Sequence, residues 1–157
     1  MLERKFFVTY VDANFGVGTP NYVLLGDDLE EYKEELNPQV ETKFNILGQQ
    51  KTYVNGWQAQ STVEPYYCNE GDPLFPKLAE IANERKTGDG LMTTKVDVLV
   101  DAEGNQQWAY RENIKVTPTS IGGDTSGVQI PFTMHNCGER VAGTWNPTTK
   151  TFNPTSA

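Results

Sequence analysis

Only one segment of the chain combines the periodicity of an α-helix with helix start and stop signals, and it is too short to form a domain by itself. Asp72 and Pro73 suit the start of a helix, as N-cap and first-turn residue. Gly88 can adopt the left-handed conformation that commonly ends a helix. Pro76 implies that the first turn is tight or that the helix begins at this residue. About four turns of helix must pack on a sheet supplied by the rest of the chain. The apolar face that would do so consists of Leu74, Phe75, Leu78, Ile81 and Ala82.

The rest of the chain has the pattern of β-strands separated by turns. Residues 5–12 are rich in aromatic and β-branched residues, and in residues 91–101 valines alternate with Asp97 and Leu99, which is typical of a half-buried strand. Pro131 indicates an edge strand or a bulge. Gly, Pro, Asn and Asp between the strands provide turns. Further strands are expected at residues 22–25, 57–68, 106–119, 128–135 and 137–145.

Length and composition predict one folded domain over residues 1–157. The chain is 37% hydrophobic and 22% charged, which is a globular composition, and its length is that of a single domain. We predict a mostly β fold, an antiparallel β-sandwich or barrel with one flanking α-helix at about residues 73–87. Residues 146–157 are expected to form a short C-terminal tail that docks on another surface or stays loose.

Residues 37–56 are unusual for a connection in a compact domain. Pro38 ends the preceding element, and Gly48 and Asn55-Gly56 are turn signals, so the segment predicts a long projecting β-hairpin. Connections of this length are uncommon without a function, and exposed apolar residues require a partner. An ordinary pair of sheet strands is the alternative. The apolar residues are Val40, Phe44, Ile46, Leu47, Tyr53 and Val54.

Residues 27–36 could form a helix, and the sequence alone does not decide whether they do. The spacing of Leu29, Tyr32 and Leu36 and the many glutamates favour a helix. Paired acidic residues could also form a calcium site or a glycosidase dyad, but no loop pattern fixes their separation, so a solvated acidic face is the simpler explanation. These pairs are Asp27/Asp28, Glu30/Glu31 and Glu34/Glu35.

The sequence contains no catalytic or cofactor-binding motif. The 13 basic and 21 acidic residues give a net charge of −8, which argues against a surface that grips nucleic acid. His135 is the only histidine, and with Cys137 it offers too few ligands for a metal site. The N-terminus lacks a signal peptide pattern and no apolar run could span a membrane, so the chain is expected to be made in the cytosol. Because the cytosol is reducing, Cys68 and Cys137 are expected to be free thiols. We therefore predict a non-enzymatic protein without metal or cofactor.

The order and spacing of several short segments resemble the tail tube proteins of long-tailed bacteriophages. The similarity covers the chain from about residue 2 to its end and is densest over residues 22–100. It extends, at the level of fold, to the tubes of contractile tails and type VI secretion. The segments are Leu36-Asn37-Pro38, Val40-Glu41-Thr42-Lys43, Asn45-Ile46-Leu47-Gly48, Val63-Glu64-Pro65-Tyr66-Tyr67, Gly71-Asp72-Pro73-Leu74-Phe75 and Glu84-Arg85-Lys86-Thr87-Gly88.

This resemblance implies a structural virion protein that self-assembles into hexameric rings, which stack into a hollow tube for DNA ejection. The implied partners are further copies of the chain and the tape measure, tail-tip and tail terminator proteins, and DNA passes through the lumen without specific binding. The implied location is the virion tail, after synthesis in the host bacterial cytoplasm, with no membrane partner. The resemblance also makes residues 27–36 a strand that leads into the hairpin. Implied inter-subunit contacts are Pro38, Val40, Phe44, Ile46, Leu47, Gly48, Tyr53 and Val54.

A monomeric β-sandwich binding module is the alternative function. Trp57, Trp108 and Trp145 would then serve as stacking platforms, for example for carbohydrate. The two hypotheses differ in where they place these rings, because core tryptophans cannot form a binding surface.

Overall fold

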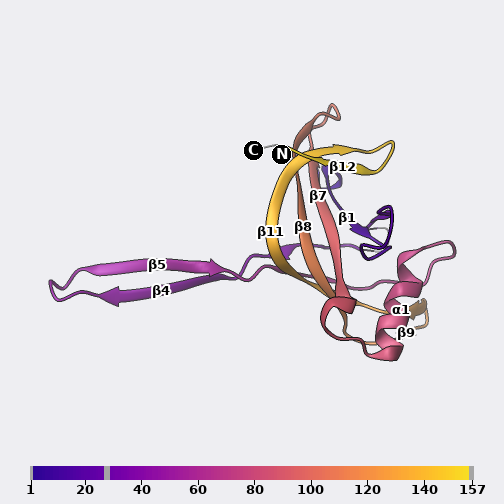
Figure 1. The fold of residues 1–157 in the computed structure, drawn as a ribbon, viewed down its shortest axis with the longest axis horizontal. Helices are drawn as coiled ribbons and strands as arrows, with labels where there is room; N and C mark the ends of the chain where they lie inside the picture. The colour runs from indigo at the N-terminus through magenta and orange to yellow at the C-terminus, as the bar shows by residue number, and fades with distance from the viewer. Residues whose placement is uncertain (1, 27–28, 156–157) are drawn as a thin grey trace.

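A curved antiparallel sheet forms the body of the protein, with one α-helix beside it (Figure 1). The computed structural model describes residues 2–26 and 29–155. The strand order is β2-β1-β7-β8-β11-β6-β3, and β12 pairs with β11. The predicted fold class, mostly β with antiparallel sheets and one flanking helix, is confirmed. The strands are β1 Phe7–Asp12, β2 Tyr22–Leu24, β3 Glu34–Glu35, β6 Gln60–Val63, β7 Met92–Val100, β8 Gln106–Pro118, β11 Phe132–Asn146 and β12 Thr151–Pro154.

Helix α1, Leu74–Glu84, begins where the sequence predicts and ends earlier. The Asp72 carboxylate accepts a hydrogen bond from the Leu74 N–H at 2.9 Å, as a capping residue does. Pro76 lies in the first turn, where backbone N–H groups have no partner within the helix, so it costs no hydrogen bond. Gly88 does not end the helix, because Arg85 takes the left-handed conformation with φ of 52°. Gly88 instead begins the short 3-10 helix η2, Gly88–Leu91.

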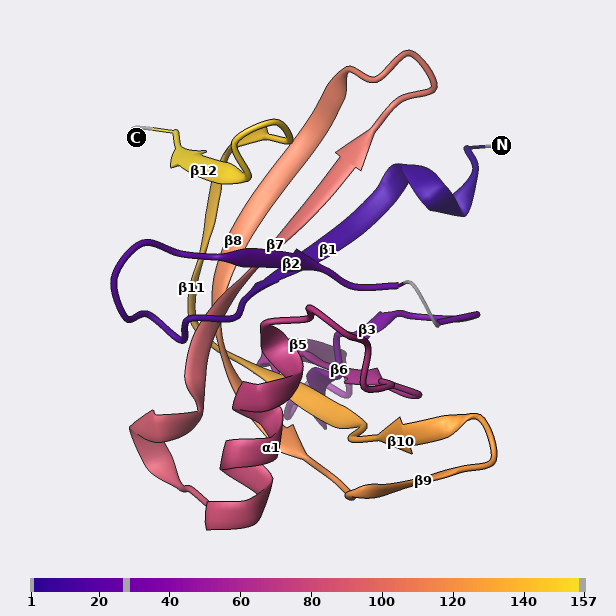
Figure 2. The ribbon, with the colours of Figure 1, turned by 90° about the vertical axis from the view of Figure 1, so that its right-hand side faces the viewer.

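The buried face of α1 covers one end of the sheet (Figure 2). Leu74 and Leu78 on the helix pack with Phe132, Ile114 and Met134 from the central strands, and all five are fully buried. A second, smaller cluster lies farther along the sheet and contains Tyr22, Val96, Val98, Ala109 and Trp145. The two clusters give the body a complete core without any contribution from residues 38–57.

The segment before residue 37 is not helical where the structure describes it. Residues 29–33 have no regular secondary structure, and β3 pairs two residues with β6, Glu34 with Ser61 and Glu35 with Gln60. The helix favoured by propensity is therefore wrong for these residues, and the strand is present only at its end. Asp27 and Asp28 lie outside the described residues.

The C-terminal third differs from the sequence prediction in how its strands are divided. Residues 122–129 are a small hairpin, β9 Gly122–Asp124 and β10 Gly127–Gln129, whereas the sequence predicts a break between strands at residues 122–127 and a strand that begins at residue 128. Pro131 lies between β10 and β11, so it occupies no strand position. Strand β11 pairs with β8 on one side, with a register shift between Cys137 and Arg140, and with β6 on the other side over residues 132–135. The predicted tail docks on the body through β12. Within the described residues, no helix has the length and apolar character required to cross a membrane.

The core contacts of α1 lead to a first prediction. Leu78→Ala should lower the free energy of unfolding by about 2–5 kcal/mol, because it leaves a cavity between helix and sheet. Urea denaturation measures the change. Lys77→Ala, one residue away on the exposed face, is the matched control and should stay within about 0.5 kcal/mol of the parent chain. Equal effects of the two variants would contradict the packing of α1 described here.

Candidate assembly surface

Residues 38–57 form a two-stranded arm that leaves the body on the side opposite α1 (Figure 1). Strand β4, Pro38–Phe44, pairs with β5, Gln50–Trp57, and with no other strand in the part of the chain that the structure describes. At the tip, the Asn45 side-chain oxygen accepts hydrogen bonds from the Leu47 and Gln49 N–H groups at 2.9 and 3.0 Å. Gly48 closes the turn with a φ of 75°, which glycine adopts without strain. The prediction of a projecting hairpin is thus confirmed.

The arm has one uncharged face and one charged face. Val40 lies opposite Val54, Thr42 opposite Thr52 and Phe44 opposite Gln50, so these six side chains share a face. The other face carries the pairs Glu41–Tyr53 and Lys43–Lys51. An uncharged face of this kind brings no stability to a strand pair that is surrounded by water. It stabilises a strand pair when a partner packs on that face.

The apolar side chains of the arm are exposed. Phe44 and Leu47 are 73% and 75% exposed, and Val40, Ile46, Tyr53, Val54 and Trp57 are each at least half exposed. All eight residues predicted as inter-subunit contacts lie on this arm. Phe44, Ile46, Leu47 and Gly48 are at or beside the tip, Val40 and Val54 face each other midway, Tyr53 is on the charged face, and Pro38 is at the root opposite Trp57.

Asn37 joins the two segments of the chain that enter and leave the arm at its root. Its side-chain amide donates to the carbonyl oxygens of Glu35 at 3.4 Å and Gln58 at 3.1 Å. Its own carbonyl accepts from the Gln58 N–H at 3.3 Å. The left-handed φ of 44° at this residue turns the chain from β3 into β4, a conformation that asparagine tolerates better than most residues.

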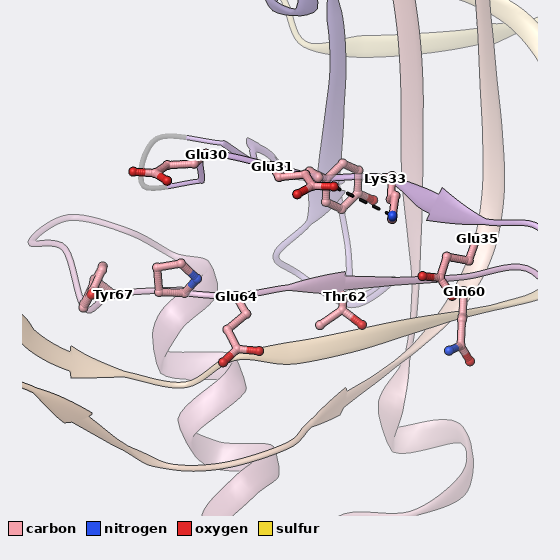
Figure 3. Close-up of a pocket in the computed structure, with 10 residues that line it drawn as sticks. Glu30, Glu31, Lys33, Glu35, Gln60, Thr62, Glu64 and Tyr67 are labelled. Carbon is pink, nitrogen blue, oxygen red and sulfur yellow. Dashed lines mark ion pairs between the residues drawn. The ribbon is translucent and has the colours of Figure 1, made fainter.

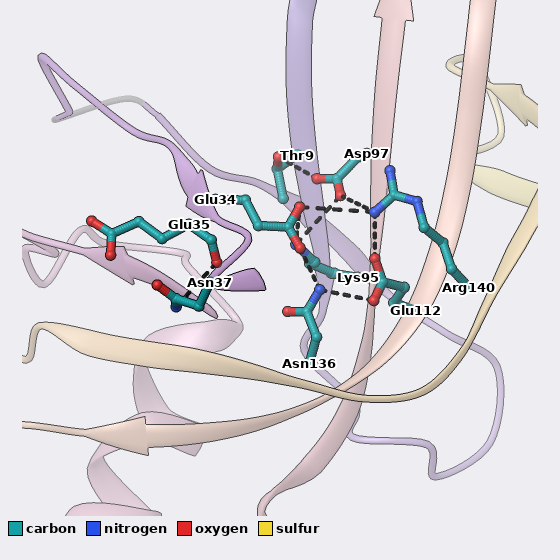
Figure 4. A network of polar contacts seen from close by, with 9 residues as sticks. All are labelled: Thr9, Glu34, Glu35, Asn37, Lys95, Asp97, Glu112, Asn136 and Arg140. Carbon is teal, nitrogen blue, oxygen red and sulfur yellow. Dashed lines mark hydrogen bonds and ion pairs between the residues drawn. The ribbon is translucent and has the colours of Figure 1, made fainter. Parts of the chain in front are cut away.

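A buried network of charges holds β3, and with it the arm root, on the body (Figure 4). Lys95 on β7 contacts Asp97 at 3.3 Å and Glu34 of β3 at 3.4 Å. Asn136 on β11 donates to Glu34 and to Glu112, which also pairs with Arg140. The Thr9 hydroxyl donates to Asp97 at 2.7 Å. Four strands of the body thus converge on β3.

The cations in this network are the side chains of Lys95 and Arg140. The carboxylates of Glu34, Asp97 and Glu112 lie within 4.8 Å of one another, a spacing that could also hold a metal ion. Lys95 and Arg140 lie among them, so three negative charges face two positive ones. Burial opposes the charge of Lys95, but the attraction of Asp97 and its other acidic neighbours outweighs it and raises the pKa of Lys95 above its ordinary value.

Sequence reasoning missed this network. The alternation in β7 predicts that Asp97 faces solvent, yet Asp97 and Lys95 are both buried, because β3 lies over them. Of the acidic pairs, Glu34 belongs to the network, while Glu30, Glu31 and Glu35 are exposed. The available signal was Lys95-Val96-Asp97, which puts opposite charges on one face of a strand of otherwise uncharged residues.

The tryptophans do not form one platform. Trp145 is buried, with ring centroids 4.4 Å from Tyr10 and 5.4 Å from Tyr22. Trp108 packs edge-on against Phe7 at 5.3 Å, and Trp57 is exposed at the arm root. A binding module built on all three rings therefore lacks its surface. Cys68 and Cys137 are free thiols, as predicted, and His135 is exposed on β11.

Comparisons with known proteins identify a shared fold. Neither a protein-family model nor a curated protein sequence matches the chain. The structure is similar to the sheath/tube terminator of an extracellular contractile injection system, PVC, in its extended state, with a TM-score of 0.57 and 8% identity over 92% of this chain and 97% of that chain. It is also similar to the tube-terminating cap of the anti-feeding prophage, with a TM-score of 0.55 and 10% identity over 92% and 91% of the two chains. The chain therefore has a fold found in tail-like particles, whereas its membership of the phage tail tube family stays a prediction.

The buried network leads to a second prediction. Lys95→Met should lower the free energy of unfolding by about 3–5 kcal/mol, because it removes the buried cation and leaves Glu34 and Asp97 with only the partly exposed Arg140, 3.8 Å from each. Lys5→Met is the matched control, since it removes an exposed pair with Glu3 and should leave stability almost unchanged. Denaturant titration of both variants measures the difference. A small effect of Lys95→Met would show that solvent reaches the network.

The raised pKa of Lys95 makes the same network sensitive to alkaline pH. A raised folded-state pKa contributes stability that is fully present below the unfolded-state pKa and is lost as the pH rises through the folded-state value. The gap in unfolding free energy between the parent chain and Lys95→Met should therefore be constant at neutral pH and shrink above about pH 10.4, the unfolded-state value. A gap that shrinks already near neutral pH would contradict this assignment.

Proposed function

We propose that this chain is a structural, non-enzymatic subunit of a tail-like tube, whose copies close into hexameric rings that stack into a hollow conduit for DNA. The observation that carries the proposal is the arm, a hairpin outside the core with exposed apolar residues along its length. Such a surface is costly on a free protein and useful in an assembly.

The fold supports the same proposal. The similar solved structures are parts of tube assemblies, and the order of sequence segments resembles phage tail tube proteins. A ring closes when one surface binds a different surface on the next copy, and stacked rings require a second such pair. The body and the arm provide separate surfaces for these two tasks. The expected partners are further copies, with tape measure, tail-tip and terminator proteins at the ends of the tube.

The charge distribution suits a conduit. The arm carries one glutamate and two lysines, so the body carries all of the net charge of −8 and one further negative charge. An acidic lumen repels phosphates and lets DNA slide without binding.

A tube terminator is the second candidate, because both similar structures are a terminator or a cap. The two candidates differ in whether rings continue to stack. Negative-stain microscopy at high protein concentration separates them: a tube subunit gives tubes of variable length, and a terminator gives rings that do not elongate. A protein that stays monomeric even with preformed tubes would contradict both.

Removal of the arm tests this proposal. Pro38 and Trp57 are paired across the arm root, so residues 39–56 can be replaced by Asn-Gly, a pair that forms a tight two-residue turn. The variant should keep the stability of the body and stay monomeric, as measured by denaturation and sedimentation.

A point variant keeps the arm and tests only its tip. Ile46→Ser with Leu47→Ser should prevent tubes, and the matched control, Val17→Ser with Ile121→Ser, removes exposed apolar residues outside the arm and should permit them. Normal tubes from the tip variant would contradict the proposed role of the arm.

A further inference from the structure

The tip of the arm carries a concentration of positive charge. Lys43 and Lys51 lie directly opposite each other across β4 and β5, next to Phe44 and the turn. Like charges in this position repel each other. Lys43 contacts Glu41 at 3.2 Å, whereas Lys51 makes no ion pair with any residue that the structure describes. A partner surface with negative charge would relieve this repulsion.

The body has an acidic groove beside the arm root (Figure 3). This cavity, of about 640 Å³, lies between residues 30–35 and residues 60–67. Its lining includes Glu30, Glu31, Glu35 and Glu64. The cation in the lining, Lys33, is 3.8 Å from Glu31, so the groove keeps an excess of negative charge.

The groove lies where the sheet opens at its edge. Pairing of β3 with β6 stops after Glu34 and Ser61, and beyond this point the two segments separate around the cavity. An open sheet edge is a surface on which another chain can pack. The groove therefore combines an accessible edge, a defined volume and a charge opposite to that of the arm tip.

The arm cannot fill its own groove. Strand β4 has seven residues, which span about 23 Å at the usual rise per residue. The arm points away from the body (Figure 1), and the residues that line the groove, 30–35 and 60–67, belong to the segments just outside the arm. The matching surface must come from a second copy.

We infer that the arm tip of one copy docks in the acidic groove of the next, with Lys43 and Lys51 facing Glu35 and Glu64. The inference rests on the proposed function and names the acceptor surface for the arm. Because donor and acceptor are different surfaces, each docked copy presents a free groove or a free arm to another, as an extending assembly requires. The contact should weaken with salt, since its charges lie near solvent.

Charge reversal in full-length protein tests the pairing. Lys43→Glu with Lys51→Glu should raise the concentration required for assembly at least tenfold, and so should Glu35→Lys with Glu64→Lys. A mixture of the two variants should assemble again, because reversed arms meet reversed grooves. Lys77→Glu with Lys150→Glu changes the net charge equally outside the arm and should assemble like the parent chain. Failure of the mixture to recover would overturn the inference.

Cross-linking separates this inference from the proposed function. A carbodiimide joins lysines to carboxylates in contact, and a mixture of ¹⁵N-labelled and unlabelled chains identifies links between copies by mass spectrometry. Links from Lys51 to the groove glutamates are expected. Tubes with links elsewhere would overturn the docking and leave the tube function standing. These links in dimers that never form tubes would support the docking and contradict the tube.

Discussion

The ion pair between Glu34 and Lys95 holds the chain on the body where it enters the arm, and the pairing of β6 with β11 holds it where it leaves the arm. Strand β3 has only two paired residues, too few to hold a position by backbone hydrogen bonds alone. Its place is set by a carboxylate that reaches a buried lysine and by Asn136 on the neighbouring strand. Buried charges tolerate few arrangements, because any displacement leaves a charge unpaired. The chain that leads into the arm is thus held both by these charges and by the apolar packing of Leu29 and Tyr32 on the core.

The residues that stabilise the fold and the exposed apolar residues lie in different parts of the molecule. The apolar clusters under α1 and near β12 are complete within the body. The arm contributes exposed valines, aromatics and a charged face that no residue of its own body covers. A chain built in this way can fold as a monomer and still carry a surface that is satisfied only by another molecule.

Local features of the structure could be predicted from the sequence, and long-range ones could not. The Asp72 cap, the apolar face of α1 and the turn at Gly48 depend on residues a few positions apart, and each was found. The helix end at Arg85 was missed, because glycine adopts the left-handed conformation more readily and Gly88 is therefore the expected end. In the structure Gly88 begins the 3-10 helix η2 instead, which the local sequence does not predict. The charge network joins residues from distant strands, and the burial of Asp97 depends on a segment about 60 positions away. The projecting apolar arm could be predicted because its apolar residues are close together in sequence, whereas the groove is formed by two separated segments.

The narrow root of the arm has a mechanical consequence. Asn37 and Gln58 join the two segments at the root, and among the described residues the arm beyond them makes no strand pairing with the body. The arm is therefore a lever: over a length of about 23 Å, a rotation of about 10° at the root moves the tip by about 4 Å. Neighbouring copies could change their relative angle by such rotations without losing contact at the tip. The stiffness of an assembly built in this way would be set at the root of each arm, not in the cores of its subunits.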